Sequence, residues 1–451
     1  MDDILAGISE FACELTYEDV PESALTAAKE RLIDTLGSAL GAYECDTVAV
    51  GRSMVSPPSN TGLVGRILGE NKDYAADGTA FVNTCMLRNL DFNDSFPGCH
   101  PSDGLGGLFS VAPVAGISGK ELVVATLISH ETIMRHIMAA NPGEHGFDQG
   151  TAIAMGAAAS VSRVLGLSRE QTAHAVSIST VGNMQLRATR SGELSMWKGC
   201  ATALAVRNAV YAVGLAKAGM TGPPEPFRGR DGLADHYPSF EWTSFGTLED
   251  DFHIAKANLK FWAVAYQMQA AAWCGIELSK QVNADDVASI AVEANEFAHF
   301  ESGSEPAKWD PQTKETADHS LPYVLAWGLR HGAIGTDAFL PESYLDPAVR
   351  PFLDAITVEV NPEFTAEYPV EMHMRATATD KQGASHVADI RNPIGHRLNP
   401  MTMDEIGEKF CRLAAPQLGE SGATAAFNCW REVESCDDVG SAFNVLSVTK
   451  A

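Results

Sequence analysis

Val287-Ala288-Ser289-Ile290-Ala291-Val292-Glu293-Ala294 is the stretch at which the residue pattern of the chain changes. Two interleaved sets of side chains alternate here, and a period of two indicates a β-strand. The same alternation returns at 356–360. A third run at 370–379 is followed by a Gly-containing turn and a second extended run to residue 390, which predicts a hairpin. This part of the chain is therefore predicted to form a small sheet.

Helical periodicity dominates on both sides of this segment. Between Pro21 and Tyr43, apolar residues recur at spacings of three and four, which places them on one helical face. The pattern returns from Thr402. Four further stretches are Ala-rich with similar spacing: 150–166, 170–185, 199–219 and 264–280. We therefore predict a mostly α fold with an inserted α+β domain, in which residues 1–269 and 396–451 form a large all-helical domain and residues 270–395 form a smaller α+β lid domain.

Length and charge exclude several classes of protein. The 451 residues exceed the roughly 250–300 at which one hydrophobic core stops growing, so a single small binding module is excluded. With 32 basic and 58 acidic residues, the net charge of −26 opposes binding to nucleic acid or to anionic membranes. The nine cysteines contain no C-x-x-C pair, and the acidic start lacks the cationic region of a signal peptide. We expect a cytoplasmic protein with reduced thiols.

Motifs for metal or nucleotide chemistry are incomplete. His130-Glu131 is followed by Met134 where a zinc-binding H-E-x-x-H helix needs histidine, so His130 is interpreted as structural. The glycines at 104–107 do not complete a dinucleotide-binding G-x-G-x-x-G. No phosphate-binding P-loop and no G-x-S-x-G nucleophile motif is present in the sequence. We expect neither a metal nor a cofactor.

The densest polar cluster of the sequence runs from Leu90 to Asp103. It holds two carboxylates, a hydroxyl and an imidazole on a segment that Pro and Gly keep irregular, and such loops often carry catalytic groups: Asp91, Asp94, Ser95 and His100. The alternative is a capped surface loop, in which Ser102 and Asp103 start the next helix.

Three weaker signals lie further along the chain. Lys198 follows Trp197 and is either a solvated helix end or an anion ligand. Lys260 stands among apolar and aromatic residues, where an unpaired ammonium is costly, so it either extends to solvent or faces an anion. Asp318 and His319 are adjacent and form either a charge pair or an acid/base unit.

These residues together resemble the MmgE/PrpD family, which includes 2-methylcitrate dehydratase, cis-aconitate decarboxylase and iminodisuccinate epimerase. The resemblance runs in order along nearly the whole chain. The segments that carry it are Leu90-Asp91-Phe92-Asn93-Asp94 with His100-Pro101-Ser102-Asp103, Ser195-Met196-Trp197-Lys198-Gly199, Gly219-Met220-Thr221-Gly222-Pro223, Glu315 to Tyr323, and Asn399-Pro400-Met401-Thr402 before Lys409-Phe410.

The resemblance implies a homodimer with its active site in the cleft between the two domains. It also implies metal-independent chemistry on a small di- or tricarboxylate. The residues that it assigns to catalysis are Asp91, His100, Lys260, His319 and Tyr323. The residues that it assigns to substrate binding are Asp94, Ser95, Asp148, Lys198, Tyr266, Gln269 and Asp318.

The reaction stays open at this point. Dehydration of a 2-methylcitrate-like acid is our leading hypothesis, and Asp148 in Gly-Phe-Asp resembles the dehydratases, whereas the decarboxylases carry histidine there. Gln149 and Gln267, however, stand where the dehydratases have histidine, and Ser95 replaces the usual threonine. An epimerase or isomerase of a dicarboxylate such as iminodisuccinate, a cis-aconitate-type decarboxylase, and a non-catalytic carboxylate binder are the alternatives.

Overall fold

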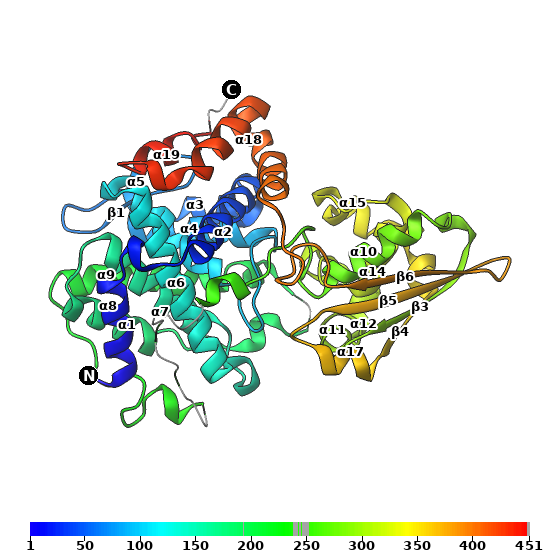
Figure 1. Cartoon of the computed structure of the whole chain (residues 1–451), viewed down its shortest axis with the longest axis horizontal. Helices are drawn as coiled ribbons and strands as arrows, with labels where there is room; N and C mark the ends of the chain where they lie inside the picture. The colour runs from blue at the N-terminus through cyan, green and yellow to red at the C-terminus, as the bar shows by residue number, and fades with distance from the viewer. Residues whose placement is uncertain (193, 238–241, 243–244, 246–251, 449–451) are drawn as a thin grey trace. The chain divides into compact units, whose positions relative to one another are not determined.

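The computed structural model describes residues 1–192, 194–237, 242, 245 and 252–448 and divides the chain into two compact units (Figure 1). Unit 1 comprises Met1–Thr189, Gly199–Ala257 and Thr402–Ala451, and unit 2 comprises Arg190–Lys198 and Asn258–Met401. The predicted fold class is confirmed, because helices dominate and one mixed sheet lies between residues 287 and 391. Within the described ranges, no helix is long and apolar enough to cross a membrane.

Unit 1 is built from helices with one short two-stranded hairpin. The strands β1 and β2 pair antiparallel at Val64–Arg66 and Asp73–Ala75. The helices are α1 (Asp3–Glu14), α2 (Glu22–Gly41), α3 (Asp46–Ser53), α4 (Ala76–Asn89), α5 (Leu105–Ala115), α6 (Gly119–Ala140), α7 (Gly150–Val164), α8 (Arg169–Val181), α9 (Ala201–Lys217), α18 (Met403–Arg431) and α19 (Gly440–Asn444).

Helices α2 and α18 bring distant parts of the chain into the core of unit 1. α18 begins at a capping box, in which the hydroxyl of Thr402 accepts from the backbone N–H of Glu405 and the Glu405 carboxylate accepts in return. The two helices approach closely at Gly37, where a Cβ atom would stand 3.0 Å from the Cα of Phe410. Any larger residue at position 37 therefore forces the two helices apart.

Unit 2 contains a four-stranded mixed sheet in the order β4-β3-β5-β6. β3 pairs in parallel with β4 and antiparallel with β5, and β5 and β6 form the predicted hairpin. The strands are β3 (Val287–Ala294), β4 (Ile356–Val360), β5 (His373–Asp380) and β6 (Ser385–Arg391). The helices are α10 (Met268–Ser279), α11 (Glu296–Ser302), α12 (Pro306–Trp309), α13 (Lys314–Ala317), α14 (Leu321–His331), α15 (Pro341–Tyr344), α16 (Arg350–Asp354) and α17 (Pro362–Glu367).

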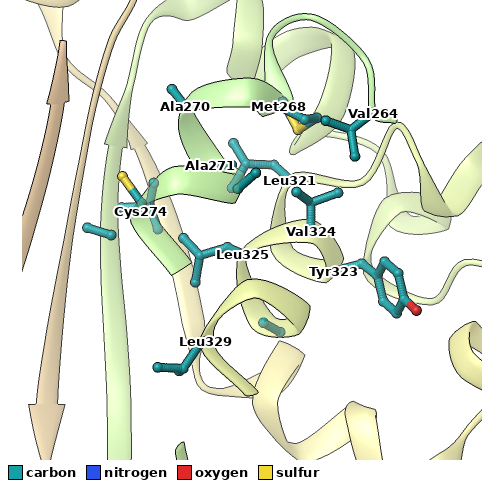
Figure 2. Packing of buried hydrophobic residues seen from close by; sticks show 14 of the residues in the cluster. Val264, Met268, Ala270, Ala271, Cys274, Leu321, Tyr323, Val324, Leu325 and Leu329 are labelled. Carbon is teal, nitrogen blue, oxygen red and sulfur yellow. The ribbon is translucent and has the colours of Figure 1, made fainter. Parts of the chain in front are cut away.

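The hydrophobic core of unit 2 lies between the sheet and helices α10 and α14. α10 packs on β5 and β6, and α14 packs on α10. The Sγ atom of Cys274 lies 3.6 Å from the carbonyl oxygen of Met374, and Figure 2 shows Leu325 and Leu329 of α14 facing the same core. Alternate residues of β5 are buried on this side, as expected for a strand with one covered face.

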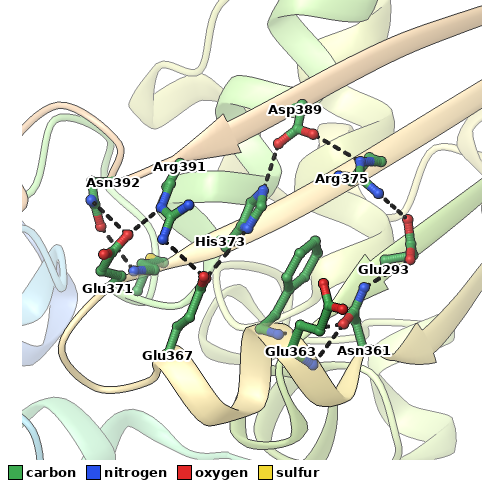
Figure 3. A network of polar contacts seen from close by, with 12 residues as sticks. Glu293, Asn361, Glu363, Glu367, Glu371, His373, Arg375, Asp389, Arg391 and Asn392 are labelled. Atoms are coloured by element: carbon green, nitrogen blue, oxygen red, sulfur yellow. Dashed lines mark hydrogen bonds and ion pairs between the residues drawn. The ribbon is translucent and has the colours of Figure 1, made fainter.

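The other face of the sheet is polar and carries α17. Figure 3 shows a network in which Asp389 accepts hydrogen bonds from His373 at 2.6 Å and Arg375 at 2.8 Å. Arg391 donates to Glu367 of α17 at 2.8 Å. These side chains lie at strand positions that alternate with the core residues, so the period of two that reveals the strands also separates the two faces.

Candidate active site

The polar loop between α4 and α5 folds inward and is buried. Asp91 directly follows the C-cap of α4 and has a φ of 49°, a left-handed conformation that costs a residue with a side chain roughly 1–2 kcal/mol. Arg88, in the last turn of α4, donates to the Asp91 carboxylate, and both side chains are almost fully buried. The guanidinium Nε of Arg88 also lies 3.6 Å from Asp103. This ion pair holds the strained residue in place.

Asp94 is the centre of a second buried contact set in the same loop. One carboxylate oxygen accepts from the backbone N–H of Ser102 at 3.0 Å and from its hydroxyl at 2.6 Å. The other oxygen lies 3.2 Å from Nε2 of His130 on α6. Burial alone would raise the pKa of Asp94, but the hydrogen bonds from His130 and Ser102 outweigh it and hold the pKa below its usual value.

His100 is the partly exposed member of this group. Its Nδ1 lies 2.6 Å from the carbonyl oxygen of Asp94, and its backbone N–H donates to Gln149 Oε1 at 2.6 Å. A carbonyl oxygen can only accept, so the proton of the neutral ring is on Nδ1 and the lone pair is on Nε2. That Nε2 lies 3.9 Å from the Asp91 carboxylate, and 16% of the side chain is exposed. His100 can therefore exchange a proton with a bound molecule while Asp91 stabilises the charged ring.

A cation from α18 supports the same loop. The ammonium group of Lys409 donates to the Asp34 carboxylate at 2.6 Å and to the carbonyl oxygen of Phe92 at 2.7 Å. It also lies 3.8 Å from the centre of the Phe92 ring, a cation–π geometry. Phe92 stands directly after Asp91, so this lysine connects α2 and α18 to the loop that carries the acid/base groups.

Unit 2 holds a second charged cluster around Asp318. Its carboxylate accepts from Nδ1 of His319 and from the ammonium of Lys314 at 3.1 Å. Its backbone carbonyl accepts from Ala265 at 2.9 Å. Burial would raise the pKa of Asp318, but the positive charges of Lys314, His319 and Lys198 bring it to about 2. His319 is thereby oriented through its Nδ1, and 18% of its side chain is exposed.

The predicted anion ligands lie in buried parts of unit 2. Lys198 ends the nine-residue segment that joins unit 2, within a 3-10 turn at Met196–Gly199, and is 5% exposed. Lys260 is fully buried. The side chain of Gln269 fixes the segment next to it, because its Oε1 accepts from the N–H groups of Phe261 and Trp262 at 3.1 and 3.0 Å. Both ammonium groups are thus largely withdrawn from solvent, where charges interact more strongly than in water.

Two predicted residues have side chains that are engaged in contacts within unit 2. Tyr323, predicted to be catalytic, belongs to the buried core of unit 2 (Figure 2). Its hydroxyl donates to the Ala338 carbonyl at 2.5 Å. Gln269, predicted to bind substrate, also donates through its amide to the Trp262 carbonyl at 2.9 Å, so both ends of the amide contact the backbone. The roles of both residues stay predictions.

The remaining predicted residues are divided between the units. Asp91, Asp94 and His100 come together in unit 1, whereas Lys198, Asp318 and His319 come together in unit 2. Ser95 and Asp148 are buried in unit 1, where the Asp148 backbone N–H donates to Gln185 at 2.8 Å. Tyr266 is buried in unit 2, with its ring stacked on His396 at 6.5 Å between centroids. Sequence-based roles for these residues stay predictions.

Several residues of the two clusters are not identified by the sequence pattern. Arg88, His130 and Lys409 contact the loop from helices, and Lys314 contacts Asp318 from the preceding turn. Lys314 stands four residues before Asp318, a helical spacing that could have revealed the pair. In the part of the chain that the structure describes, no group of three or more His, Cys, Asp and Glu side chains could hold a metal ion.

Comparison with known proteins matches two family profiles to the chain. Residues 6–242 match the profile of the MmgE/PrpD N-terminal domain, and residues 262–432 match that of the MmgE/PrpD C-terminal domain. The mitochondrial 2-methylcitrate dehydratase of Yarrowia lipolytica is 27% identical over 415 residues, which cover 83% of this chain and 76% of that protein. The 2-methylcitrate dehydratase of Cupriavidus necator is 24% identical over 433 residues, covering 88% and 86%. That of Escherichia coli K12 is 26% identical over 416 residues, covering 85% and 84%.

Proposed function

The chain belongs to the MmgE/PrpD family, and on that premise we propose that it is a lyase that removes water from a 2-methylcitrate-like hydroxy di- or tricarboxylate. The observation that carries the proposal is the geometry of His100. Its Nδ1 is fixed by the Asp94 carbonyl, and its Nε2 is directed to the Asp91 carboxylate at 3.9 Å. A neutral imidazole held in this way is suited to take a proton at Nε2 and to carry it as an imidazolium beside Asp91.

Dehydration then proceeds by an elimination. His100 takes the proton from the carbon next to a carboxylate, and the electron pair of that C–H bond forms the C=C bond. The C–O bond to the hydroxyl group breaks, and the hydroxyl leaves as water with a proton from a general acid. Our candidate for that acid is His319, because the Asp318 carboxylate holds its ring through Nδ1.

Negative charge builds on the substrate carboxylate as the C–H bond breaks. Lys198 and Lys260 are our candidates for the groups that bind the substrate carboxylates. Both are buried, and a fixed cation in a water-poor environment stabilises such charge more strongly than a solvated one. The net charge of −26 over the chain does not oppose this, because the local sign is set by the nearest groups.

Epimerisation of a dicarboxylate is a second candidate, which one observation favours. Gln267 stands where the dehydratases carry histidine, and its side chain hydrogen-bonds the Tyr368 hydroxyl. An amide cannot supply a proton to a leaving hydroxyl. An epimerase needs only proton removal on one face of the carbon and proton return on the other.

Two measurements on one set of acids separate these reactions. The purified protein is incubated in D₂O with citrate, 2-methylcitrate or citramalate, while ultraviolet absorbance follows C=C formation and proton NMR follows exchange next to the carboxylates. Dehydration gives a new C=C absorbance together with loss of the C–H signal next to a carboxylate. Deuterium incorporation without a C=C bond identifies an epimerase, and the absence of both with every acid would contradict the lyase proposal.

A further inference from the structure

A second histidine–carboxylate pair, His130 and Asp94, lies next to His100. His130 lies in the middle of α6, and its Nε2 is 3.2 Å from a carboxylate oxygen of Asp94. Its Nδ1 is 3.0 Å from the carbonyl oxygen of Thr126, one helical turn earlier. Both side chains of the pair are fully buried, with 0% exposure each. The pair is therefore held at both ends of the imidazole ring and is shielded from solvent.

The hydrogen-bond partners determine where the protons are. The Thr126 carbonyl only accepts, so Nδ1 of His130 carries a proton. The contact between Nε2 and the Asp94 carboxylate needs a second proton, and Ser102 already donates twice to the other oxygen of Asp94. One proton is therefore shared between Nε2 of His130 and the Asp94 carboxylate. The two side chains form a buried hydrogen-bonded pair.

The pair acts on His100 through the main chain. The carboxylate of Asp94 is fixed on one side by Ser102 and on the other by His130, and this fixes the peptide that follows Asp94. The carbonyl oxygen of that peptide accepts from Nδ1 of His100 at 2.6 Å. If Asp94 rotates, this acceptor turns away and His100 loses the contact that selects its tautomer.

We propose that His130 is a positioning residue that holds His100 in its Nδ1-protonated tautomer by pairing with Asp94. Its effect on turnover rests on the proposed function, in which Nε2 of His100 takes the proton. Its effect on the tautomer of His100 does not depend on which reaction the protein performs. Burying a polar pair this deeply costs free energy of folding. The folding of the loop alone does not require such a pair.

The test compares three variants of the full chain. His130→Leu removes both hydrogen bonds, and His130→Gln keeps an N–H donor towards Asp94 without the imidazole ring, in case the leucine variant does not fold. His136→Leu is the matched control. His136 is also fully buried on α6, but burial lowers its pKa to about 3, and its ring packs against Tyr237 at 5.9 Å between centroids.

The first readout is ¹⁵N NMR of the imidazole rings, with the His100 signals assigned from a His100→Gln variant. We expect the neutral ring of His100 to be Nδ1-protonated in the parent protein and in His136→Leu. In His130→Leu it becomes a mixture of tautomers, and His130→Gln falls between. An unchanged tautomer in a folded His130→Leu variant would overturn the proposal, whatever the activity.

The second readout is the split between kcat and KM on the acid that the parent protein converts. A misplaced base lowers kcat by ~10–100-fold while KM stays within about twofold, and His130→Gln recovers part of the loss. Equal losses in His130→Leu and His136→Leu that follow their loss of stability would also overturn the proposal. A tautomer change in a protein that converts no acid leaves the positioning role standing and removes the proposed function.

Discussion

His100 in unit 1 and His319 in unit 2 are held through the same ring nitrogen by acceptors of different chemistry. The acceptor for Nδ1 of His100 is the carbonyl oxygen of Asp94, whereas that for His319 is the carboxylate of Asp318. A carbonyl fixes the tautomer but adds no full charge, whereas a carboxylate also stabilises the imidazolium. This difference is the basis on which we propose His100 as the base and His319 as the acid.

The surroundings of the two histidines differ as well. The Asp91 carboxylate next to His100 forms an ion pair with Arg88. The loop between α4 and α5 is also contacted by His130 from α6 and by Lys409 from α18. Asp318 is supported by Lys314 from the preceding helical turn. The loop of His100 thus depends in part on partners 36 and 317 residues away, whereas Lys314 stands four residues before Asp318. Variants that remove one kind of support test this distinction.

The largest effect is expected for Lys409→Met. This variant leaves the Asp34 carboxylate buried without its cation, and breaking a buried pair costs about 3–5 kcal/mol of unfolding free energy. Lys409→Arg keeps the charge and is expected to lose less. Denaturant unfolding measures both, and the double variant Asp34→Asn/Lys409→Met is expected to regain part of the loss. Equal stability of the single and double variants would show that the pair does not support the loop.

The next effect concerns turnover. His100→Ala is expected to lower kcat by ~10²-fold or more, because a general base is removed from the reacting carbon. Steady-state kinetics with the converted acid measures this, and circular dichroism confirms folding. His236→Ala, an exposed histidine of unit 1, is the control and is expected to leave kcat unchanged. A kcat close to that of the parent protein would remove His100 from the reaction.

A third prediction concerns stability in acid. The pKa of Asp318 is lowered from its ordinary value of 3.8 to about 2 in the folded chain, so its contribution to stability is present above about pH 4 and is lost as the pH falls towards 2. Asp318→Asn removes this loss, so its unfolding free energy is expected to fall less between pH 5 and pH 2.5.

Denaturant unfolding at the two pH values measures the effect. Asp286→Asn, at an exposed aspartate of unit 2, is expected to keep the steep acid dependence of the parent protein. If Asp318→Asn kept it too, the low pKa of Asp318 would not contribute to stability.

The smallest effect is expected for Tyr323→Phe. The variant leaves the Ala338 carbonyl without its donor, which costs about 1–3 kcal/mol of unfolding free energy. Turnover is expected to stay within twofold, because the hydroxyl is engaged in the core. A large fall in kcat would restore the catalytic role that the sequence predicts for Tyr323.

The strands were predictable because their signal is local. The alternation at 287–294 and 356–360 follows from one covered face of a sheet, and the structure has strands at these positions. The run Leu321-Pro322-Tyr323-Val324-Leu325 is similarly apolar, and it could have placed Tyr323 in the core. Asp91 and His100 stand out in a single polar loop.

The supports of that loop were not predictable in this way. His130 pairs with a residue 36 positions earlier, and Lys409 contacts Phe92 across 317 positions. Each stands on a helix whose local pattern does not reveal its partner. In the sequence, His130-Glu131 matches only an incomplete zinc motif. Contacts of this kind depend on how whole helices pack. The periodicity of apolar residues shows which face of a helix is buried, but not which residues that face contacts.

The return of the chain to unit 1 at Thr402 has a consequence for biosynthesis. Lys409 pairs with Asp34 across 375 residues, so a chain that emerges from the ribosome completes the segment Asn258–Met401 of unit 2 before α18 exists. Until then the surface of α2 that α18 covers is exposed, and unit 1 stays an incomplete intermediate. Intermediates with exposed apolar surface are prone to aggregate, so the late arrival of α18 leaves unit 1 in such a state for most of the synthesis of the chain.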